Sequence, residues 1–140
     1  MKIERYLILL ILVIPVLILR DFTPNNELKY LSIVDEALRD GHFFTFFHQG
    51  ELYADKPPLY FWLLMLSKWI WGEYNMFGLS LFSIIPALIS IYIMNKWVEE
   101  ETTTSLRWNG SLMLFTSAFF IGSGLVLRMD MLMCMFILLA

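Results

Sequence analysis

The sequence predicts an all-α membrane protein, a multi-span helical bundle with surface helices in a long first extracytoplasmic loop. Hydrophobic residues make up 59% of the chain and charged residues only 16%, whereas ordinary globular domains carry about 25% charged residues. The mean hydropathy is +0.66. The apolar residues are also gathered into runs of about 14–20 residues, which are the lengths of interfacial and membrane-spanning helices.

The first apolar run covers about residues 6–20 and is bounded by Arg5 and Arg20. About 14 apolar residues are few for crossing about 30 Å of hydrocarbon, but the arginines can extend the reach of the helix by snorkelling. A cleaved signal peptide is the alternative, because Lys2 and Arg5 make the start basic. No small-residue cleavage site follows, so the sequence favours an uncleaved anchor with a cytoplasmic N-terminus.

Residues 21–75 are expected to form the external loop. Within it, Glu27 to Asp40 has the pattern of an amphipathic helix that Asn25 or Asn26 caps and Gly41 ends. The apolar stripe of this helix consists of Leu28, Leu31, Val34 and Leu38. We expect this face to lie on the membrane surface.

A second surface helix is predicted at Pro58 to Trp71. This segment is apolar but only about 14 residues long, a length more often interfacial than spanning. Lys68 interrupts it, and Trp62 and Trp69 favour the headgroup region. We expect it on the same side of the membrane as the loop.

Further spans are predicted at about residues 76–94 and 111–127, and another begins at 131. Only about half of the length that a spanning helix needs follows Met131. The sequence is therefore interpreted as the N-terminal part of a longer protein.

Three polar clusters interrupt this apolar chain. The first holds Glu27 and Lys29, the second Asp55 and Lys56, and the third Arg128 and Asp130. If the segment at 58–71 does not span, all three emerge on the outer side and can meet. If it does span, the third cluster lies on the cytoplasmic side.

Composition excludes some classes of function. The net charge is −3, and no basic block interleaves with aromatic residues, so nucleic acid is not an expected partner. Cys134 is the only cysteine, which rules out an internal disulfide. His42 and His48 lack metal-ligand spacing with any partner.

Three short motifs carry a resemblance to a known family. They are Asn26-Glu27-Leu28-Lys29-Tyr30, Lys56-Pro57-Pro58-Leu59-Tyr60-Phe61-Trp62 and Arg128-Met129-Asp130. In this order they resemble the Asp-Glu-x-Arg-Tyr, Lys-Pro-Pro-x-x-Tyr-Trp-like and Arg-x-Asp motifs of one superfamily. This is the superfamily of bacterial protein O-mannosyltransferases and aminoarabinose transferases, which are membrane glycosyltransferases.

The resemblance implies a glycosyltransferase of the bacterial inner membrane whose active site faces outside. It implies a polyprenyl-phosphate-linked sugar as donor, membrane lipids as surroundings, and an extracytoplasmic lipid, glycan or protein as acceptor. One departure matters: the family's catalytic aspartate falls at or next to Asn26, and an amide cannot act as a general base.

The residues suggest how such a transfer would be divided among them. The leaving lipid phosphate needs a cation, for which Lys56 is the first candidate, with Lys29 and Arg128 as further carrier-phosphate ligands. The acceptor needs a carboxylate base, with Glu27 the first candidate and Asp130 the second. In the resembled family an acid before the lysine can contact a metal, so Asp55 is the candidate ligand of a divalent ion.

Simpler roles for the same residues stay open. Asp55 and Lys56 could be an exposed ion pair, Glu27 could only favour a helix N-terminus, and Arg128 with Asp130 could be a helix-end pair. The alternative function is accordingly a non-catalytic membrane protein, or an inactive remnant of such a transferase.

Overall fold

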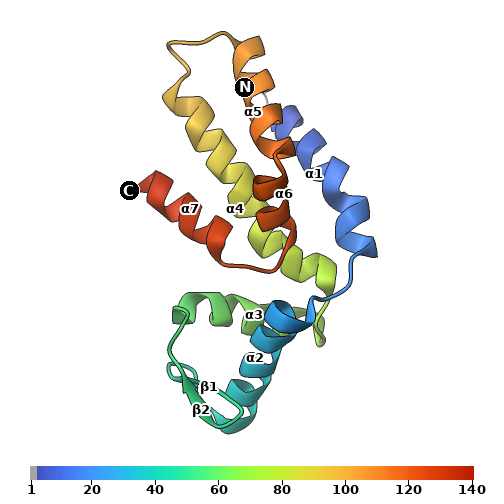
Figure 1. Cartoon of the computed structure of the whole chain (residues 1–140), viewed down its shortest axis with the longest axis vertical. Helices are drawn as coiled ribbons and strands as arrows, with labels where there is room; N and C mark the ends of the chain where they lie inside the picture. Colours follow the sequence, from blue (N-terminus) through green and yellow to red (C-terminus); the bar gives the residue numbers. More distant parts are fainter. Residues whose placement is uncertain (1–2) are drawn as a thin grey trace. The chain divides into compact units, whose positions relative to one another are not determined.

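The computed structural model describes residues 3–140, which form two compact units (Figure 1). One unit is Arg20–Leu79, and the other combines Met1–Leu19 with Ser80–Ala140. The elements, in chain order, are α1 (Ile3–Leu19), the π-helical turn η1 (Pro24–Leu28), α2 (Lys29–Asp40), β1 (Phe46–His48), β2 (Glu51–Tyr53), α3 (Pro58–Trp71), α4 (Met76–Trp97), α5 (Thr104–Thr116), α6 (Ala118–Leu125) and α7 (Asp130–Leu139). The described chain is mostly helical, as predicted, and its β-hairpin was not predicted.

Within residues 3–140, α4 is the helix whose length and apolar composition would allow it to cross a bilayer. Helices α6 and α7 would also qualify if they are taken as one broken segment, although they meet at an angle of 108°. The multi-span bundle therefore stays a prediction.

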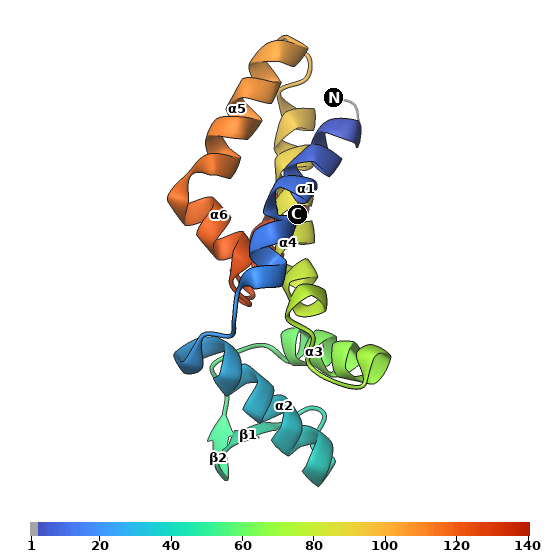
Figure 2. The ribbon, with the colours of Figure 1, turned by 90° about the vertical axis from the view of Figure 1, so that its right-hand side faces the viewer.

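The unit that contains α1 and most of α4 is built around one apolar cluster. Leu9, Val13 and Leu17 recur every four residues on α1, so they form a stripe on one side of that helix. They are buried in the same cluster as Ile84 and Ile91 of α4. Figure 2 shows α1, α4, α5 and α6 of this unit from the side of α1.

The span predicted at 111–127 is not one helix. Helix α5 ends at Thr116, and Ser117 has an extended backbone (φ −62°, ψ 133°) before α6 begins. The Ser117 hydroxyl donates to the carbonyl of Leu114 at 2.8 Å. The Thr116 hydroxyl donates to that of Leu112 at 2.7 Å. Two adjacent hydroxyls that bond preceding carbonyls compete with the helical ladder, which accounts for the break.

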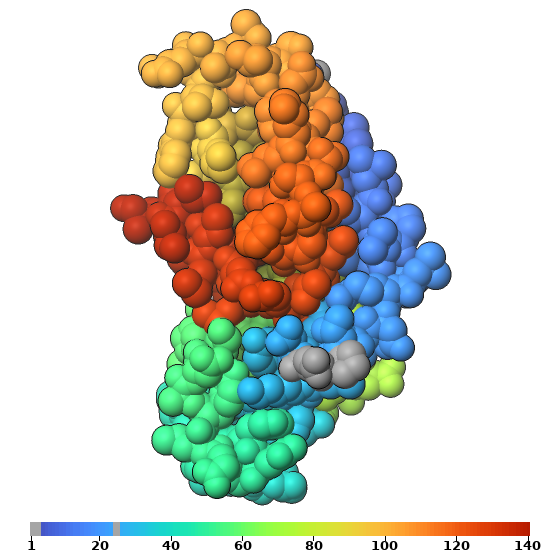
Figure 3. Space-filling view, in the orientation of Figure 1, coloured from blue at the N-terminus to red at the C-terminus, as the bar shows by residue number. Residues whose placement is uncertain are grey.

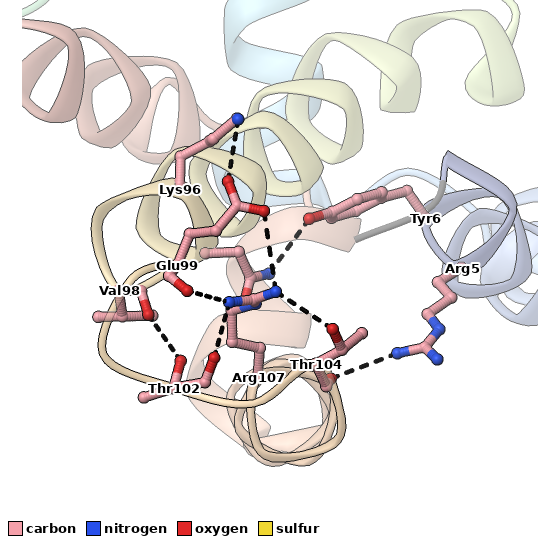
Figure 4. A network of polar contacts seen from close by, with 9 residues as sticks. Arg5, Tyr6, Lys96, Val98, Glu99, Thr102, Thr104 and Arg107 are labelled. Carbon is pink, nitrogen blue, oxygen red and sulfur yellow. Dashed lines mark hydrogen bonds and ion pairs between the residues drawn. The ribbon is translucent and has the colours of Figure 1, made fainter.

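Helix α5 also begins earlier than expected, because Thr103 caps it by accepting from the Leu106 amide at 3.3 Å. The Arg107 side chain bonds the backbone of the loop between α4 and α5, as Figure 4 shows. Its Nη1 donates to the carbonyls of Glu99 (2.7 Å) and Thr102 (2.9 Å). Its side chain is only 7% exposed, so these carbonyls compensate a buried cation.

The other unit is organised around α2, which packs against β1 and α3. Figure 3 is a space-filling view of the chain. The buried residues of α2 are Tyr30, Leu31, Ile33, Val34 and Ala37. The expected stripe was wrong at its ends, because Leu28 and Leu38 are exposed. The apolar face of this helix lies against the protein and is not free to cover a membrane surface.

The ends of the loop helices agree only in part with the sequence. Gly41 ends α2 with φ +75°, and α3 has the predicted bounds, with Pro58 in its first turn and Gly72 after its end. The start of α2 differs, because η1 precedes it and Thr23 stands at the N-cap of that turn. Asn26 therefore lies inside a helical turn, and the side chain of Asn25 is outside the described residues.

The hairpin turns at Gln49 and Gly50, which both have positive φ (56° and 81°). This is the geometry of a tight two-residue turn. The carboxylate of Glu36 accepts from both of their amides, at 2.9 and 3.0 Å. The turn is thereby tied to α2, and β2 leads directly into the Asp55–Lys56 segment.

Candidate functional site

Lys56 occupies the segment between the hairpin and α3. Its side chain is only 28% exposed, and its Nζ lies 3.7 Å from Oδ2 of Asp55. That distance exceeds the 2.7–2.9 Å typical of a charge-assisted hydrogen bond. No described residue accepts a hydrogen bond from this ammonium, although an ammonium has three protons to donate. Lys56 is therefore a largely covered cation with unused donor capacity.

Tyr53 connects this segment to α2. Its hydroxyl donates to Oδ2 of Asp55 at 3.1 Å, and the Lys29 ammonium lies 4.6 Å from the centre of its ring. Burial and the hydrogen bond to Asp55 raise the pKa of the Tyr53 hydroxyl, which therefore keeps its proton. Tyr53 thus connects Lys29 with Asp55, the neighbour of Lys56, and nothing in the sequence pattern gives a sign of this contact.

A hollow of about 450 Å³ opens beside these groups. Tyr53, Asp55 and Lys56 supply its polar wall, and Phe44 and Pro57 contribute to its apolar wall. An apolar concavity of this size with a few convergent polar groups is the usual form of a small-ligand site.

Glu27 is placed differently from a free base. Its side chain is fully buried and forms an ion pair with Arg20 through Oε1. Its Oε2 accepts from the Thr23 amide at 2.6 Å and from the Thr23 hydroxyl at 3.0 Å. Both oxygens are engaged, so Glu27 holds the turn that leads into α2. In the sequence Arg20 marks only the end of the first apolar run, and its spacing from Glu27 gives no sign of this pair.

The third cluster lies in the other unit. Arg128 Nε and Asp130 Oδ2 are 2.6 Å apart, and both side chains are about half exposed. The backbone of Arg128 is held by Ser83 of α4, whose hydroxyl donates to the Arg128 carbonyl at 3.2 Å. Asp130 begins α7, where the helix dipole favours a carboxylate. The expectation that this cluster meets the other two stays a prediction.

The expected metal ion finds little support in the side chains. Among the described residues, no three His, Cys, Asp or Glu side chains come together in a group that could hold an ion. Asp55 is one carboxylate, and Tyr53 already engages one of its oxygens. The described residues alone do not make a divalent-ion site, and the role of Asp55 as a metal ligand stays a prediction.

Comparisons with known proteins find relatives of low identity. The chain is 28% identical over 96 residues to the undecaprenyl phosphate-alpha-4-amino-4-deoxy-L-arabinose arabinosyl transferase of Pseudomonas savastanoi pv. phaseolicola, which is 69% of this chain and 18% of the relative. An uncharacterised protein of Aquifex aeolicus is 28% identical over 107 residues, or 69% of this chain and 21% of that protein. The arabinosyl transferase of Pseudomonas aeruginosa is 26% identical over 84 residues, or 58% of this chain and 15% of the relative.

The chain thus spans about a fifth of the length of the curated relatives that it matches. No family model matches the sequence, and no solved structure matches it. The similarity is coarse, and it supports the superfamily of transferases that use a lipid-phosphate-linked sugar.

Proposed function

We propose that this chain belongs to a membrane glycosyltransferase that moves a sugar from a polyprenyl-phosphate carrier to an extracytoplasmic lipid, glycan or protein. We place it in the bacterial inner membrane with its site facing outside. Two of the relatives above are named as transferases of a sugar carried on undecaprenyl phosphate. The observation in the structure that carries the proposal is the Lys56 ammonium, which is largely covered and has no hydrogen-bond acceptor among the described residues.

Lys56 suits the leaving group of such a transfer. An acceptor oxygen attacks the anomeric carbon, and the bond from that carbon to the carrier phosphate breaks. The bonding electrons leave with the phosphate, which becomes more negative and needs a cation more than a proton donor. Lys29 and Arg128 are weaker candidates for this role, because Lys29 lies over the Tyr53 ring and Arg128 is paired with Asp130.

The acceptor must lose a proton during the transfer, and we assign this proton to Asp130 before Glu27. One oxygen of Asp130, Oδ2, is engaged by Arg128. Its Oδ1 receives no hydrogen bond from any described residue. Glu27 has both oxygens engaged and is fully buried. This order reverses the one that the motif comparison suggested.

The decisive experiment substitutes Lys56 in the full-length protein in its membrane. Lys56→Met should abolish transfer from a polyprenyl-phosphate sugar, and Lys56→Arg should retain part of it, because the charge stays while the donor geometry changes. Lys68→Met is the matched control, because Lys68 lies in the same unit but its ammonium already forms an ion pair with Asp35 at 2.6 Å. Turnover near that of the unmodified protein in Lys56→Met would refute the phosphate role.

A non-catalytic protein or inactive remnant is the second candidate, and Asn26 favours it. An amide stands where the resembled family has its catalytic aspartate, and the neighbouring Glu27 is committed to Arg20. Asn26→Asp and Asn25→Asp test this candidate. If either substitution creates transfer in an otherwise silent protein, this copy has lost its base, and the remnant is the correct description.

A further inference from the structure

The hollow beside Lys56 has an apolar wall as well as a cation. Its lining includes Phe44, Leu52 and Pro57. The Phe44 side chain is 79% exposed and that of Leu52 is 63% exposed, so neither is packed into the interior of its unit. The Lys56 ammonium borders the same hollow and is largely covered. The hollow therefore offers apolar surface and one cation to the same ligand.

The Phe44 ring is held in place by a tryptophan of α3. It packs edge-on against Trp62, with ring centres 5.6 Å apart and ring planes at 84°, an arrangement that aromatic pairs prefer. The indole Nε1 of Trp62 also donates to the carbonyl of Phe43 at 2.7 Å. These two contacts tie the segment before the hairpin to α3. An exposed ring that is fixed in advance loses little freedom when a ligand covers it, which favours binding.

The position of Phe44 beside the cation separates it from other exposed apolar residues. Such side chains are common on proteins when they stand singly, and they need no special explanation. Phe43 is one of these, because it is about half exposed and does not belong to the lining of the hollow. A ligand that contacts both Phe44 and Lys56 must carry a negative group next to an apolar chain. A prenyl phosphate has this chemistry.

The chain of a lipid phosphate needs cover as much as its charge does. A phosphate that leaves the hydrocarbon to reach a group outside the membrane draws the first carbons of its chain into water. Leaving these carbons exposed is unfavourable in proportion to their apolar area. An apolar wall next to the ammonium removes them from water again, and a water-soluble phosphate gains nothing from that wall.

We infer that Phe44 is a specificity-determining residue that packs against the first isoprene units of the carrier, so that the site selects a lipid phosphate over a water-soluble one. This inference rests on the proposed function, because it takes the carrier phosphate to bind at Lys56. Lys56 donates to the phosphate, and Phe44 covers the adjoining part of the chain together with Leu52 and Pro57.

The test compares two phosphate monoesters with the same charged group, geranyl phosphate and methyl phosphate. Their binding to the purified full-length protein is measured at one fixed detergent concentration, so that partitioning into micelles is the same for every variant. Phe44→Ser should weaken binding of geranyl phosphate by about 10-fold and leave binding of methyl phosphate unchanged. Phe44→Leu keeps an apolar side chain and should bind geranyl phosphate nearly as well as the unmodified protein.

Phe43→Ser is the matched control. It removes a neighbouring ring that does not line the hollow, and the backbone carbonyl to which Trp62 donates remains. Both esters should bind to it as they bind to the unmodified protein. Weaker binding of geranyl phosphate to Phe43→Ser, equal to the loss in Phe44→Ser, would contradict the specific role of Phe44.

Three further results would overturn this role. If Phe44→Ser binds geranyl phosphate normally, the ring does not contact the chain. If Phe44→Ser weakens binding of both esters equally, the ring supports the fold of the segment. If Phe44→Leu loses as much as Phe44→Ser, the contact is specific to an aromatic ring and does not depend on apolar cover.

Lys56→Met keeps the inference distinct from the proposed function. In each of the cases that overturn the role of Phe44, the phosphate site still stands if Lys56→Met abolishes binding of both esters. If Lys56→Met binds both esters normally, the proposed phosphate site falls, and the inference about Phe44 falls with it.

Discussion

Glu27→Gln is predicted to act first on stability and only secondarily on chemistry. The carboxylate of Glu27 is fully buried and compensates Arg20, whose side chain is 17% exposed. The neutral amide preserves the shape of the side chain but leaves the guanidinium without its counter-charge. Arg20 also donates to the sulfur of Met76 at 3.7 Å, but a thioether is a weak acceptor.

The size of the effect follows from the burial. Removing one partner of a buried ion pair costs about 3–5 kcal/mol, because the remaining charge stays buried. Replacing both partners by apolar residues of similar volume is often close to neutral. Arg20→Met with Glu27→Leu should therefore be more stable than Glu27→Gln alone. The two contacts from Thr23 add to the loss, because its amide and hydroxyl both bond the same carboxylate.

Denaturant unfolding of the full-length protein in detergent, followed by tryptophan fluorescence, would measure this. Trp62, Trp69 and Trp71 of α3 report on the same unit as Glu27. We expect Glu27→Gln to lose about 3 kcal/mol or more and the double substitution to recover most of it. If Glu27→Gln lowered the free energy of unfolding by less than about 1 kcal/mol while turnover fell by a factor of about 10²–10⁴, the structural role would be refuted. Glu27 would then again be the first candidate for the base.

Three further predictions test other parts of the structure. Burial and the hydrogen bond to Asp35 raise the pKa of Tyr74 above its ordinary value near 10. The Tyr74 hydroxyl therefore loses its proton at a lower pH in the unfolded chain than in the folded one. Its contribution to the free energy of unfolding is fully present below about pH 10 and is lost as the pH rises above that value. Unfolding curves at pH 9 and pH 11 would show this, and Tyr74→Phe should reduce the difference between them. Ser117→Ala removes the hydroxyl at the break between α5 and α6 and should raise helix content measured by circular dichroism; unchanged helix content would mean that the hydroxyl does not cause the break. The topology can be tested with single cysteines in a Cys134-free protein. A cysteine at position 73, in place of Glu73, should be labelled from outside, and one in place of Glu100 should be labelled only from inside. Labelling at position 73 from the cytoplasm would contradict the expected topology.

Local signals in the sequence predicted the helix ends best. Pro58 and Gly72 mark the two ends of α3 by backbone chemistry alone, because proline suits a first helical turn and glycine suits a left-handed residue after the last. Gly41 works in the same way for α2. These residues act on their own backbone, so no knowledge of the tertiary structure is needed to interpret them.

Contacts between distant segments could not be predicted in this way. The face of α2 was assigned to the membrane because the sequence shows only that it is apolar and not what covers it. The turn of the hairpin at residues 46–53 is bonded by Glu36, which stands 13 residues before Gln49 in the sequence. Arg20 and Glu27 likewise meet because the turn η1 brings the Glu27 carboxylate back to the Arg20 side chain.

The same distinction bears on the missing aspartate. The motif comparison pointed to Glu27 as a replacement base because it is the nearest carboxylate in the sequence. A general base needs an oxygen that the acceptor hydroxyl can reach, and in Glu27 one oxygen faces Arg20 and the other faces Thr23. Asp130 lies far away in the sequence but is about half exposed and stands at a helix N-terminus. If the protein is active, the base is therefore to be sought at Asp130, and Asp130→Asn should reduce kcat by about 10²–10⁴ while binding of polyprenyl phosphate at Lys56 stays unchanged. Full activity in that variant would exclude Asp130 as the base. If Glu27→Gln were also fully active, both candidate carboxylates would be excluded.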